Sequence, residues 1–223
     1  MLILSDFDGT ITSEDVTNVL WDQFGIDGWR ERLLPPYREG LVSTLELMDE
    51  GWRAISVGQA ELLEVAHRDI GLRAGFLEFV ETCARQAWGF HVVSCGLDWY
   101  LSAFLPAGVA YTCYRGVLED GWRVRLPAGC SLPAGTDFKI HVMRGLLDAR
   151  GADSTVFIGD GRNDLPIARA CDKVFAVRGS TLARLCREHH VPCEEFEDFR
   201  SIAASLLAAP SPEPRSSTLS QSV

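Results

Sequence analysis

The sequence predicts an α/β protein with an open sheet of parallel strands and a small helical block inserted after the first strand. Three observations support this fold class. Short apolar segments alternate with helical segments from about residue 74 onward, a pattern typical of parallel sheets. Segment 13–73 contains helical patterns and no convincing strand. The 223 residues are 47% hydrophobic, which is enough to bury a sizeable core.

The first strand is expected at Leu2–Asp6, because an apolar run leads into the first carboxylate. Apolar residues at helical spacing follow, with Ser13 as the N-cap candidate. The helical patterns continue to about Arg73, and we expect Pro35 and Pro36 to break one of them. The helical segments of this block are SEDVTNVLWDQFG, GWRERLLPPYREG, STLELMDEGWRAI and AELLEVAHRDI.

The second part of the chain alternates between extended and helical segments. The expected strands are GFHVVS, VAYTCYRG, WRVRLP, STVFIGD and KVFAV, and the expected helices are RAGFLEFVETCARQA, LDWYLSAFL, DFKIHVMRGLLDARG, RNDLPIARACD and STLARLCREHH. Asp120 and Gly121 form a hairpin signal between two of these strands. Gly151 is expected to end a helix. The final segment, 209–223, is rich in Pro and Ser and is expected to be disordered.

Composition and charge exclude several classes of protein. The net charge is −10, with 21 Lys and Arg against 31 Asp and Glu, and this disfavours binding to nucleic acid. The early apolar run is too short for a signal peptide or a membrane span. The seven cysteines are scattered and odd in number, which suits a reducing compartment. We therefore expect a cytoplasmic protein that acts on a small molecule.

One cysteine cluster, CREHHVPC at residues 186–193, has a composition that would suit zinc. It lacks two ligand pairs separated by a long loop, and its two histidines are adjacent. We therefore interpret this segment as a helix end followed by a buried strand.

Polar residues follow three of the predicted strands, at the edge where open parallel sheets bind ligands. They are Asp6 and Asp8 after LIL, Ser94, Cys95 and Gly96 after HVV, and Gly159, Asp160, Gly161, Asn163 and Asp164 after TVFI. A single Asp after a strand is usually a turn residue or a helix cap. The hypothesis of a ligand site therefore depends on the occurrence of polar residues after all three strands. Because extended side chains alternate, Asp6 and Asp8 can face the same side, where Asp160 can join them. Three converging carboxylates require a cation, and oxygen ligands suit Mg²⁺.

The segments DFDGTIT, VVSCG, DFKIHV with Lys139, and IGDGRNDLPIA resemble, in order and spacing, the four motifs of haloacid dehalogenase superfamily phosphatases. The resemblance extends to about Ala208. It implies a Rossmann-like core of residues 1–12 and 74–208 and a helical cap of residues 13–73. The cap resembles those of phosphoserine phosphatases and of the methionine-salvage phosphatases that act on 2-hydroxy-3-keto-5-methylthiopentenyl 1-phosphate. DFDGTITSED is somewhat more similar to the latter, because phosphoserine phosphatases usually have another residue where Gly9 stands.

The resemblance implies Mg²⁺-dependent hydrolysis of a small phosphorylated metabolite. Asp6 would be the nucleophile that forms an aspartyl-phosphate, and Asp8 would protonate the leaving alcohol and then activate water. The metal would be held by Asp6, the backbone carbonyl of Asp8 and Asp160, with Asp164 supporting the metal site. Phosphate or substrate contacts are expected from Thr10, Asp15, Ser94, Cys95, Gly96, Lys139 and Asn163.

Several positions in this pattern bear on the substrate. Cys95 stands where similar proteins usually have glycine, and we interpret it as a small residue near the phosphate rather than a catalytic thiol. Asp15 lies near the place where phosphoserine phosphatases bind the amino group, although an acid there also suits the start of a helix. Trp21, Trp29 and Trp52 would favour an apolar substrate group, or simply form the core of the cap. Phosphoserine and a methylthio enol phosphate are both candidate substrates.

The sequence also bears on two other functions and on the assembly of the protein. A phosphotransferase or mutase on the same scaffold would pass the phosphoryl group to an acceptor other than water, and the sequence does not separate it from a hydrolase. A receiver-like regulatory domain is disfavoured, because the carboxylate pair follows strand one and a cap comes next. An exposed apolar patch between cap helices would support a homodimer.

Overall fold

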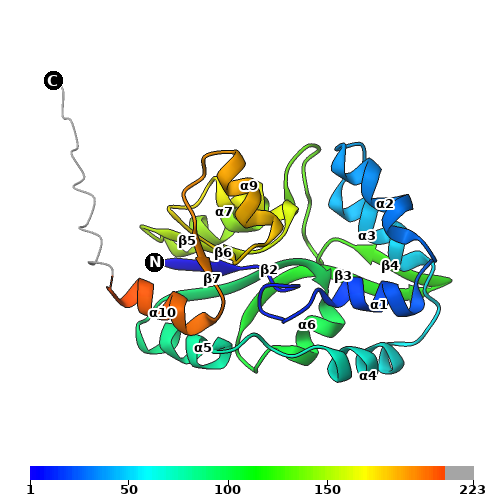
Figure 1. Cartoon of the computed structure of the whole chain (residues 1–223), viewed down its shortest axis with the longest axis horizontal. Helices are drawn as coiled ribbons and strands as arrows, with labels where there is room; N and C mark the ends of the chain where they lie inside the picture. Colours follow the sequence, from blue (N-terminus) through cyan, green and yellow to red (C-terminus); the bar gives the residue numbers. More distant parts are fainter. Residues whose placement is uncertain (209–223) are drawn as a thin grey trace.

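The computed structural model describes residues 1–208, and the predicted disordered segment 209–223 lies outside them (Figure 1). The described chain forms a seven-stranded sheet of order β4-β3-β2-β1-β5-β6-β7. Only β3 and β4 pair in antiparallel fashion within this sheet. The strands are β1 (Leu2–Ser5), β2 (Gly89–Leu97), β3 (Ala110–Glu119), β4 (Gly121–Arg125), β5 (Thr155–Gly159), β6 (Lys173–Val177) and β7 (Glu194–Phe196).

Helices cover both faces of the sheet. The helical elements are α1 (Val16–Phe24), α2 (Trp29–Arg38), α3 (Thr44–Arg53), α4 (Gln59–Asp69), α5 (Phe76–Arg85), α6 (Asp98–Phe104), α7 (Phe138–Arg150), the 3₁₀ turn η1 (Arg162–Asp164), α8 (Leu165–Ala168), α9 (Thr181–Glu188) and α10 (Phe199–Ala208). Helices α5 and α10 lie on one face, and α7 and α9 lie on the other (Figure 1). The predicted α/β class, with a mostly parallel sheet and a helical block after the first strand, is confirmed.

Strand β1 is the central element that positions the site. Its residues are fully buried, and it pairs with β2 on one side and β5 on the other. Ser5, its last residue, is in register with Val92 of β2 and Ile158 of β5. Since these three strands are parallel, the residues that follow each of them meet at one edge of the sheet.

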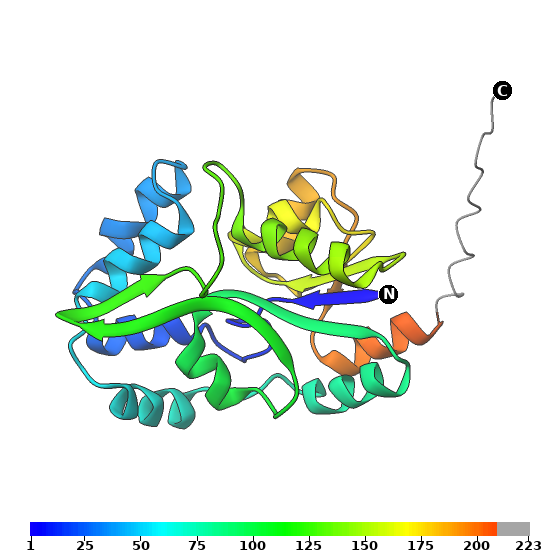
Figure 2. The ribbon, with the colours of Figure 1, turned by 180° about the vertical axis from the view of Figure 1, so that it is seen from behind.

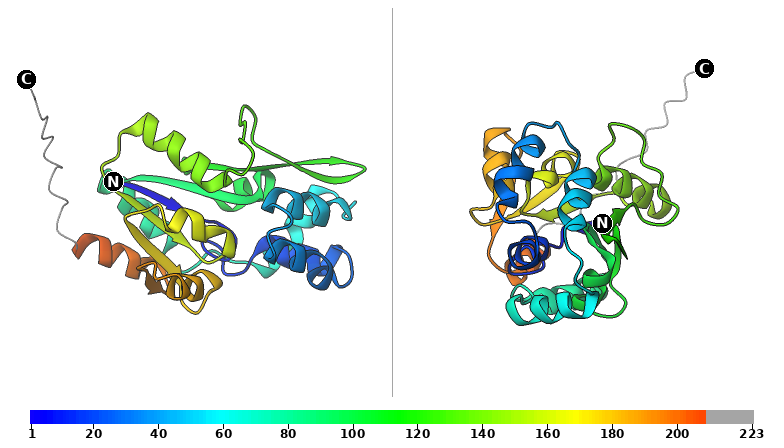
Figure 3. Two further views of the ribbon diagram at one scale, coloured as in Figure 1. Left: turned by 90° about the horizontal axis from the view of Figure 1, so that it is seen from above. Right: turned by 90° about the vertical axis from the view of Figure 1, so that its right-hand side faces the viewer.

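Helices α1–α3 gather at the end of the molecule opposite to the N-terminus (Figure 3). The β3–β4 hairpin, with its predicted turn at Asp120 and Gly121, extends beside them (Figure 2). The hairpin packs on α3: the backbone N–H of Val124 donates to Asp49 at 2.9 Å, and Arg123 forms a salt bridge with the same carboxylate. The sequence patterns did not predict this contact between the hairpin and the helical block.

The start of α1 differs from the prediction. Asp15, and not Ser13, is the N-cap residue, and its carboxylate accepts the backbone N–H of Asn18 at 2.8 Å. Ser13 instead accepts the backbone N–H of Gly71, where the chain returns from the helical block. Ser and Asp are both favourable N-cap residues. Asp15 caps α1 here because Ser13 is held in the connection between the helical block and the sheet.

The predicted break at Pro35 and Pro36 is wrong, because α2 continues through both residues to Arg38. The fixed φ of proline is compatible with a helix, and the main cost is the loss of two N–H donors. The carbonyls that lose their donors belong to Glu31 and Arg32, four residues earlier, and both residues are exposed to water. The helix ends within three residues of the prolines, so only one turn is affected.

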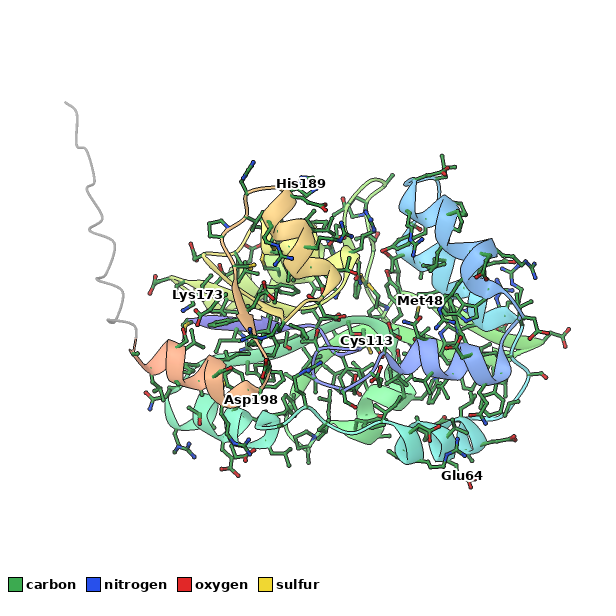
Figure 4. The ribbon with its side chains drawn as sticks, in the orientation of Figure 1. Met48, Glu64, Cys113, Lys173, His189 and Asp198 are labelled. Carbon is green, nitrogen blue, oxygen red and sulfur yellow. The ribbon has the colours of Figure 1, made fainter. Side chains whose placement is uncertain are left out.

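The predicted ends of two later helices agree better with the structure than the predicted break at Pro35 and Pro36. Helix α7 ends at Gly151 in the left-handed conformation, as expected. The segment CREHHVPC forms the end of α9, which confirms the predicted helix end, and His189 lies just beyond the helix (Figure 4). The strand that follows, β7, is not buried as predicted, because only its last residue, Phe196, is buried. All seven cysteines fall within the described residues and are free thiols. Residues 1–208 contain no helix that is both long and apolar enough to cross a bilayer.

Candidate active site

Asp6 follows β1 directly and forms an ion pair with Lys139 of α7. The ammonium of Lys139 lies 2.7 Å from Oδ1 of Asp6 and 2.5 Å from Oδ1 of Asp164, and all three side chains are buried. Burial disfavours the charged ammonium, but the two carboxylates outweigh this effect and raise the pKa of Lys139 well above its usual value. Lys139 therefore carries a fixed positive charge beside the candidate nucleophile.

Asp164 holds the loop that carries Asp160. Its Oδ2 accepts the backbone N–H groups of Asp160 and Gly161, at 2.9 and 2.8 Å. Both oxygens of Asp164 are thus engaged, one with this loop and one with Lys139. This geometry fits the supporting role expected for Asp164.

Asp160 faces the turn that follows Asp6. Thr10 is fully buried, and its hydroxyl donates to Oδ1 of Asp160 at 2.8 Å, so this side chain is turned toward Asp160 rather than toward a phosphate. Gly9 has a φ of +73°, and a Cβ there would lie 2.8 Å from Oδ2 of Asp160. Only glycine gives both this backbone conformation and this close approach.

Three carboxylates form a cluster that could hold a divalent cation. Ligand oxygens of Asp6, Asp160 and Asp164 lie within 4.8 Å of one another. Burial, followed by the charge of Asp164, raises the pKa of Asp6 to about 7, although Lys139 opposes this. Burial and the charges of Asp6 and Asp164 also raise the pKa of Asp160 well above its usual value. A cation would relieve this repulsion, and the oxygen donors fit Mg²⁺.

The carboxylate of Asp8 is not part of this cluster. Its Oδ2 accepts a hydrogen bond from the hydroxyl of Tyr100 at 2.9 Å, and its Oδ1 accepts the backbone N–H of Val16 at 3.1 Å. Burial, with the charges of Asp15 and Asp6, raises the pKa of Asp8 well above its usual range. This raised pKa favours the protonated form of Asp8, and any metal contact would have to come from its backbone carbonyl.

The second motif lies inside β2 rather than after it, because the strand extends to Leu97. The pairing of β2 with β3 shifts register between Ser94 and Leu97, and such irregularities re-aim side chains near active sites. Ser94 is buried, its oxygen accepts the backbone N–H of Gly96 at 2.9 Å, and its hydroxyl lies 3.4 Å from Asp8. Burial raises the pKa of the Cys95 thiol to about 12, which supports its interpretation as a neutral, non-nucleophilic residue.

A cavity of about 410 Å³ connects these residues to the helical block. Met48 of α3, labelled in Figure 4, belongs to its wall. The polar wall includes Asp6, Asp8, Asp15, Ser94, Cys95, Asp160 and Asn163, and the apolar wall includes Trp21, Trp29, Leu34, Tyr37, Leu47 and Met48. The predicted site residues thus converge around one cavity, with Thr10, Gly96, Lys139 and Asp164 not on its wall.

Two residues at the site carry no signal in the sequence. Tyr100 of α6 bonds to Asp8, and Arg73 donates to the backbone carbonyls of Gly9 and Thr10, at 2.6 and 2.7 Å. Arg73 thereby fixes the turn between Asp6 and α1. Neither residue belongs to a recognisable motif, and the contacts depend on segments far apart in the chain.

The chain matches the family model described as haloacid dehalogenase-like hydrolase over residues 3–169, which is most of its length. The chain is a haloacid dehalogenase-like hydrolase. The matched range includes Asp6, Ser94, Lys139 and Asp160, one residue from each of the four motif segments.

Several curated relatives of this hydrolase are named phosphatases. A polyol phosphate phosphatase of Saccharomyces cerevisiae is 27% identical over 225 residues, covering 92% of each chain. A 2-hydroxy-3-keto-5-methylthiopentenyl-1-phosphate phosphatase of an Exiguobacterium species is 30% identical over 208 residues, covering 88% of this hydrolase and 94% of the relative. The similarity in both cases extends over almost the full length of both proteins.

Solved structures of phosphoserine phosphatase have the same fold as this hydrolase. A substrate-bound complex superposes with a TM-score of 0.72 at 20% identity, covering 92% of this chain and 97% of the other. A phospho-aspartyl intermediate analogue gives a TM-score of 0.71 at 19% identity, with the same coverage. At these identities the likeness shows the fold and not the substrate.

Proposed function

We propose that this hydrolase is a Mg²⁺-dependent phosphomonoesterase that acts on a small phosphorylated metabolite through an aspartyl-phosphate intermediate on Asp6. The observation that carries the proposal is the pair of carboxylates with different surroundings. Asp6 lies 2.7 Å from a buried ammonium, beside two further carboxylates. Asp8 lies apart from them and is hydrogen-bonded to a tyrosine. One carboxylate is thus suited to attack and the other to carry a proton.

The reaction takes place in two steps. The carboxylate of Asp6 attacks phosphorus, the bond from phosphorus to the ester oxygen breaks, and this oxygen takes a proton from Asp8. Asp8, now ionised, accepts a proton from a water molecule that attacks the aspartyl-phosphate. Inorganic phosphate leaves, and both carboxylates return to their starting states.

The remaining residues stabilise charge and position the phosphate. Lys139 supplies a positive charge beside Asp6, where negative charge accumulates in the transition state. Asn163 lines the cavity and is suited to donate hydrogen bonds to phosphoryl oxygens, and Ser94 lies on the same wall with its hydroxyl directed to Asp8. Asp6 and Asp160 would hold Mg²⁺, with Asp164 positioning the loop of Asp160. When bound, this ion would neutralise phosphoryl oxygens and orient them for in-line attack.

The cavity supports a substrate with an apolar portion. Its wall on α1–α3 includes tryptophan, leucine, tyrosine and methionine side chains, together with the polar residues Thr17, Asn18, Arg30, Arg38 and Thr44. Asp15 lines the cavity, but its carboxylate already accepts the N–H of Asn18, which weakens the case for binding an ammonium group. We therefore propose a methylthio enol phosphate or a related hydroxylated phosphate ester ahead of phosphoserine. Both classes are named among the substrates of its relatives.

The test is phosphate release from a panel of esters, with and without Mg²⁺. The panel contains phosphoserine, phosphocholine, sugar and polyol phosphates, p-nitrophenyl phosphate and an enol phosphate of the methylthio type. We expect Mg²⁺-dependent release, and its loss in Asp6→Asn but not in Asp148→Asn, a change at an exposed residue of α7. Full activity in Asp6→Asn would contradict the proposal. Consumption of ester without free phosphate would indicate a phosphotransferase or mutase instead.

The proposal extends to the division of the chain into cap and core, to its cellular location and to its assembly. We propose that residues 13–73, which contain α1–α4, act as a cap over the core formed by residues 1–12 and 74–208. A cytoplasmic location is supported by the seven free cysteines. A homodimer stays a prediction, and Leu41, which is 73% exposed between α2 and α3, is the apolar residue that such an interface would cover.

A further inference from the structure

Tyr100 lies against the carboxylate that the proposed mechanism uses as acid and base. It comes from α6, and its side chain is completely buried. Its hydroxyl donates a hydrogen bond to Oδ2 of Asp8 at 2.9 Å. A buried tyrosine hydroxyl needs a partner, and this one is paired with a side chain at the centre of the reaction.

The tyrosine has a second partner, Thr17 in the first turn of α1. The two hydroxyl oxygens are 3.1 Å apart. Tyr100 has one proton, and because Asp8 receives it, the hydroxyl of Thr17 must donate to the oxygen of Tyr100. The backbone N–H of Val16, the neighbour of Thr17, donates to the other oxygen of Asp8 at 3.1 Å. Asp8 is therefore held from α6 on one side and from α1 on the other.

The chain leaves space for this contact at Gly96. A Cβ at this position would lie 2.1 Å from the hydroxyl oxygen of Tyr100 and 2.4 Å from Oδ2 of Asp8. Any side chain at Gly96 would push the two groups apart. The glycine of the second motif thus serves the tyrosine–aspartate pair.

The contacts determine which oxygen of Asp8 is able to react. A carboxylate has about four acceptor sites. Oδ2 accepts from Tyr100 and, at 3.4 Å, from Ser94, whereas Oδ1 accepts only from Val16. The unused acceptor site is on Oδ1.

We propose that Tyr100 is a positioning residue for proton transfer: it fixes the carboxyl group of Asp8 so that Oδ1 faces the ester oxygen. In the first step the proton moves from Oδ1 to the ester oxygen, while the bond from this oxygen to phosphorus breaks and the bond from phosphorus to Asp6 forms. This inference rests on the proposed phosphatase function. It also connects the acid to the cap, because Thr17 belongs to α1.

Substrates with different leaving groups distinguish a positioning role of Tyr100 in proton transfer from a merely structural role. An alkyl phosphate needs a proton on its leaving oxygen, whereas p-nitrophenolate leaves without one. The value of kcat/KM covers only the steps up to departure of the alcohol. For Tyr100→Phe we expect kcat/KM to fall about 10- to 100-fold on glycerol 3-phosphate and to stay close to wild type on p-nitrophenyl phosphate. In Tyr100→Phe, slower activation of water by Asp8 would make hydrolysis of the aspartyl-phosphate rate-limiting. The release of p-nitrophenolate would then begin with a burst equal to the enzyme concentration.

Tyr111→Phe is the control, because it removes a hydroxyl from an exposed tyrosine on β3 that is not among the hydrogen-bond partners of Asp8. Equal losses of kcat/KM on both esters in Tyr100→Phe, or no loss on either, would overturn the inference. A crystal structure of Tyr100→Phe gives a readout that does not depend on activity. We expect the carboxyl group of Asp8 to rotate or to occupy more than one orientation. An unchanged single orientation would contradict the positioning role even if the protein proved to have no phosphatase activity.

Discussion

Replacing Lys139 by Met removes the one ammonium that lies among the buried carboxylates of the site. Met is unbranched and apolar, so it can occupy the buried path of the lysine side chain without a large cavity. The ammonium lies 2.7 Å from Asp6 and 2.5 Å from Asp164. Removing one partner of a buried ion pair usually costs about 3–5 kcal/mol of unfolding free energy. Proton uptake by Asp6, whose pKa burial already raises to about 7, should keep the loss near the lower end at neutral pH.

The assay is urea unfolding followed by circular dichroism, with EDTA present to remove divalent ions. The matched control is Lys173→Met, because Lys173 is a partly exposed lysine whose ammonium lies 3.2 Å from Glu194. A surface pair of this kind contributes at most about 1 kcal/mol. Addition of Mg²⁺ should then stabilise Lys139→Met more than wild type, because the cation offsets the carboxylates that have lost their lysine.

The result that would refute this reasoning is a loss in Lys139→Met no larger than in Lys173→Met. The charge of Lys139 would then contribute nothing to the balance of the site. Equal stabilisation of wild type and Lys139→Met by Mg²⁺ would show that the ion does not bind near the carboxylates of Asp6 and Asp164.

Two further predictions follow from individual contacts. Gly9→Ala strains a backbone with φ of +73° and places a methyl group 2.8 Å from Asp160, so the Mg²⁺ concentration for half-maximal phosphate release should rise; an unchanged Mg²⁺ titration would contradict this. Burial would raise the pKa of Asp49, but hydrogen bonds from Arg123 and the backbone of Val124 outweigh it and lower this pKa to about 2. Ionised Asp49 therefore stabilises the fold by about 1–2 kcal/mol after solvent screening, fully above pH 4 and decreasingly as the pH falls toward 2. Thermal unfolding of Asp49→Asn should lack this loss below pH 4, and the same pH profile as wild type would count against the pairing.

The sequence predicts the convergence of the site because parallel topology leaves little freedom. A buried strand such as β1, once placed in the centre of a parallel sheet, brings Asp6 to the edge where its neighbours end. The acidic residues after β5 then fall into range of Asp6, as the alternation of strands and helices indicates. The place of Lys139 was expected only from the resemblance of DFKIHV to a family motif, and the order of the strands is given by the structure.

Contacts made by single side chains across the fold were not visible in the same way. In the sequence, Tyr100 is one of several large apolar residues of a predicted helix. Its contact with Asp8 is seen only in the structure. The contact of Arg123 with Asp49 joins the hairpin to α3 over 74 residues. Local rules also failed at Pro35, because an exposed final turn tolerates the loss of a hydrogen bond that a helix interior does not.

The central claim is that the phosphoryl group passes through Asp6, and rapid-quench mass spectrometry tests it most directly. The enzyme is mixed with Mg²⁺ and p-nitrophenyl phosphate, stopped in acid within milliseconds and digested. We predict that the peptide containing Asp6 gains the mass of one phosphoryl group, and that Asp6→Asn gives no such peptide. Phosphate on a histidine or a serine, or rapid turnover with no phosphorylated peptide at any quench time, would contradict the account.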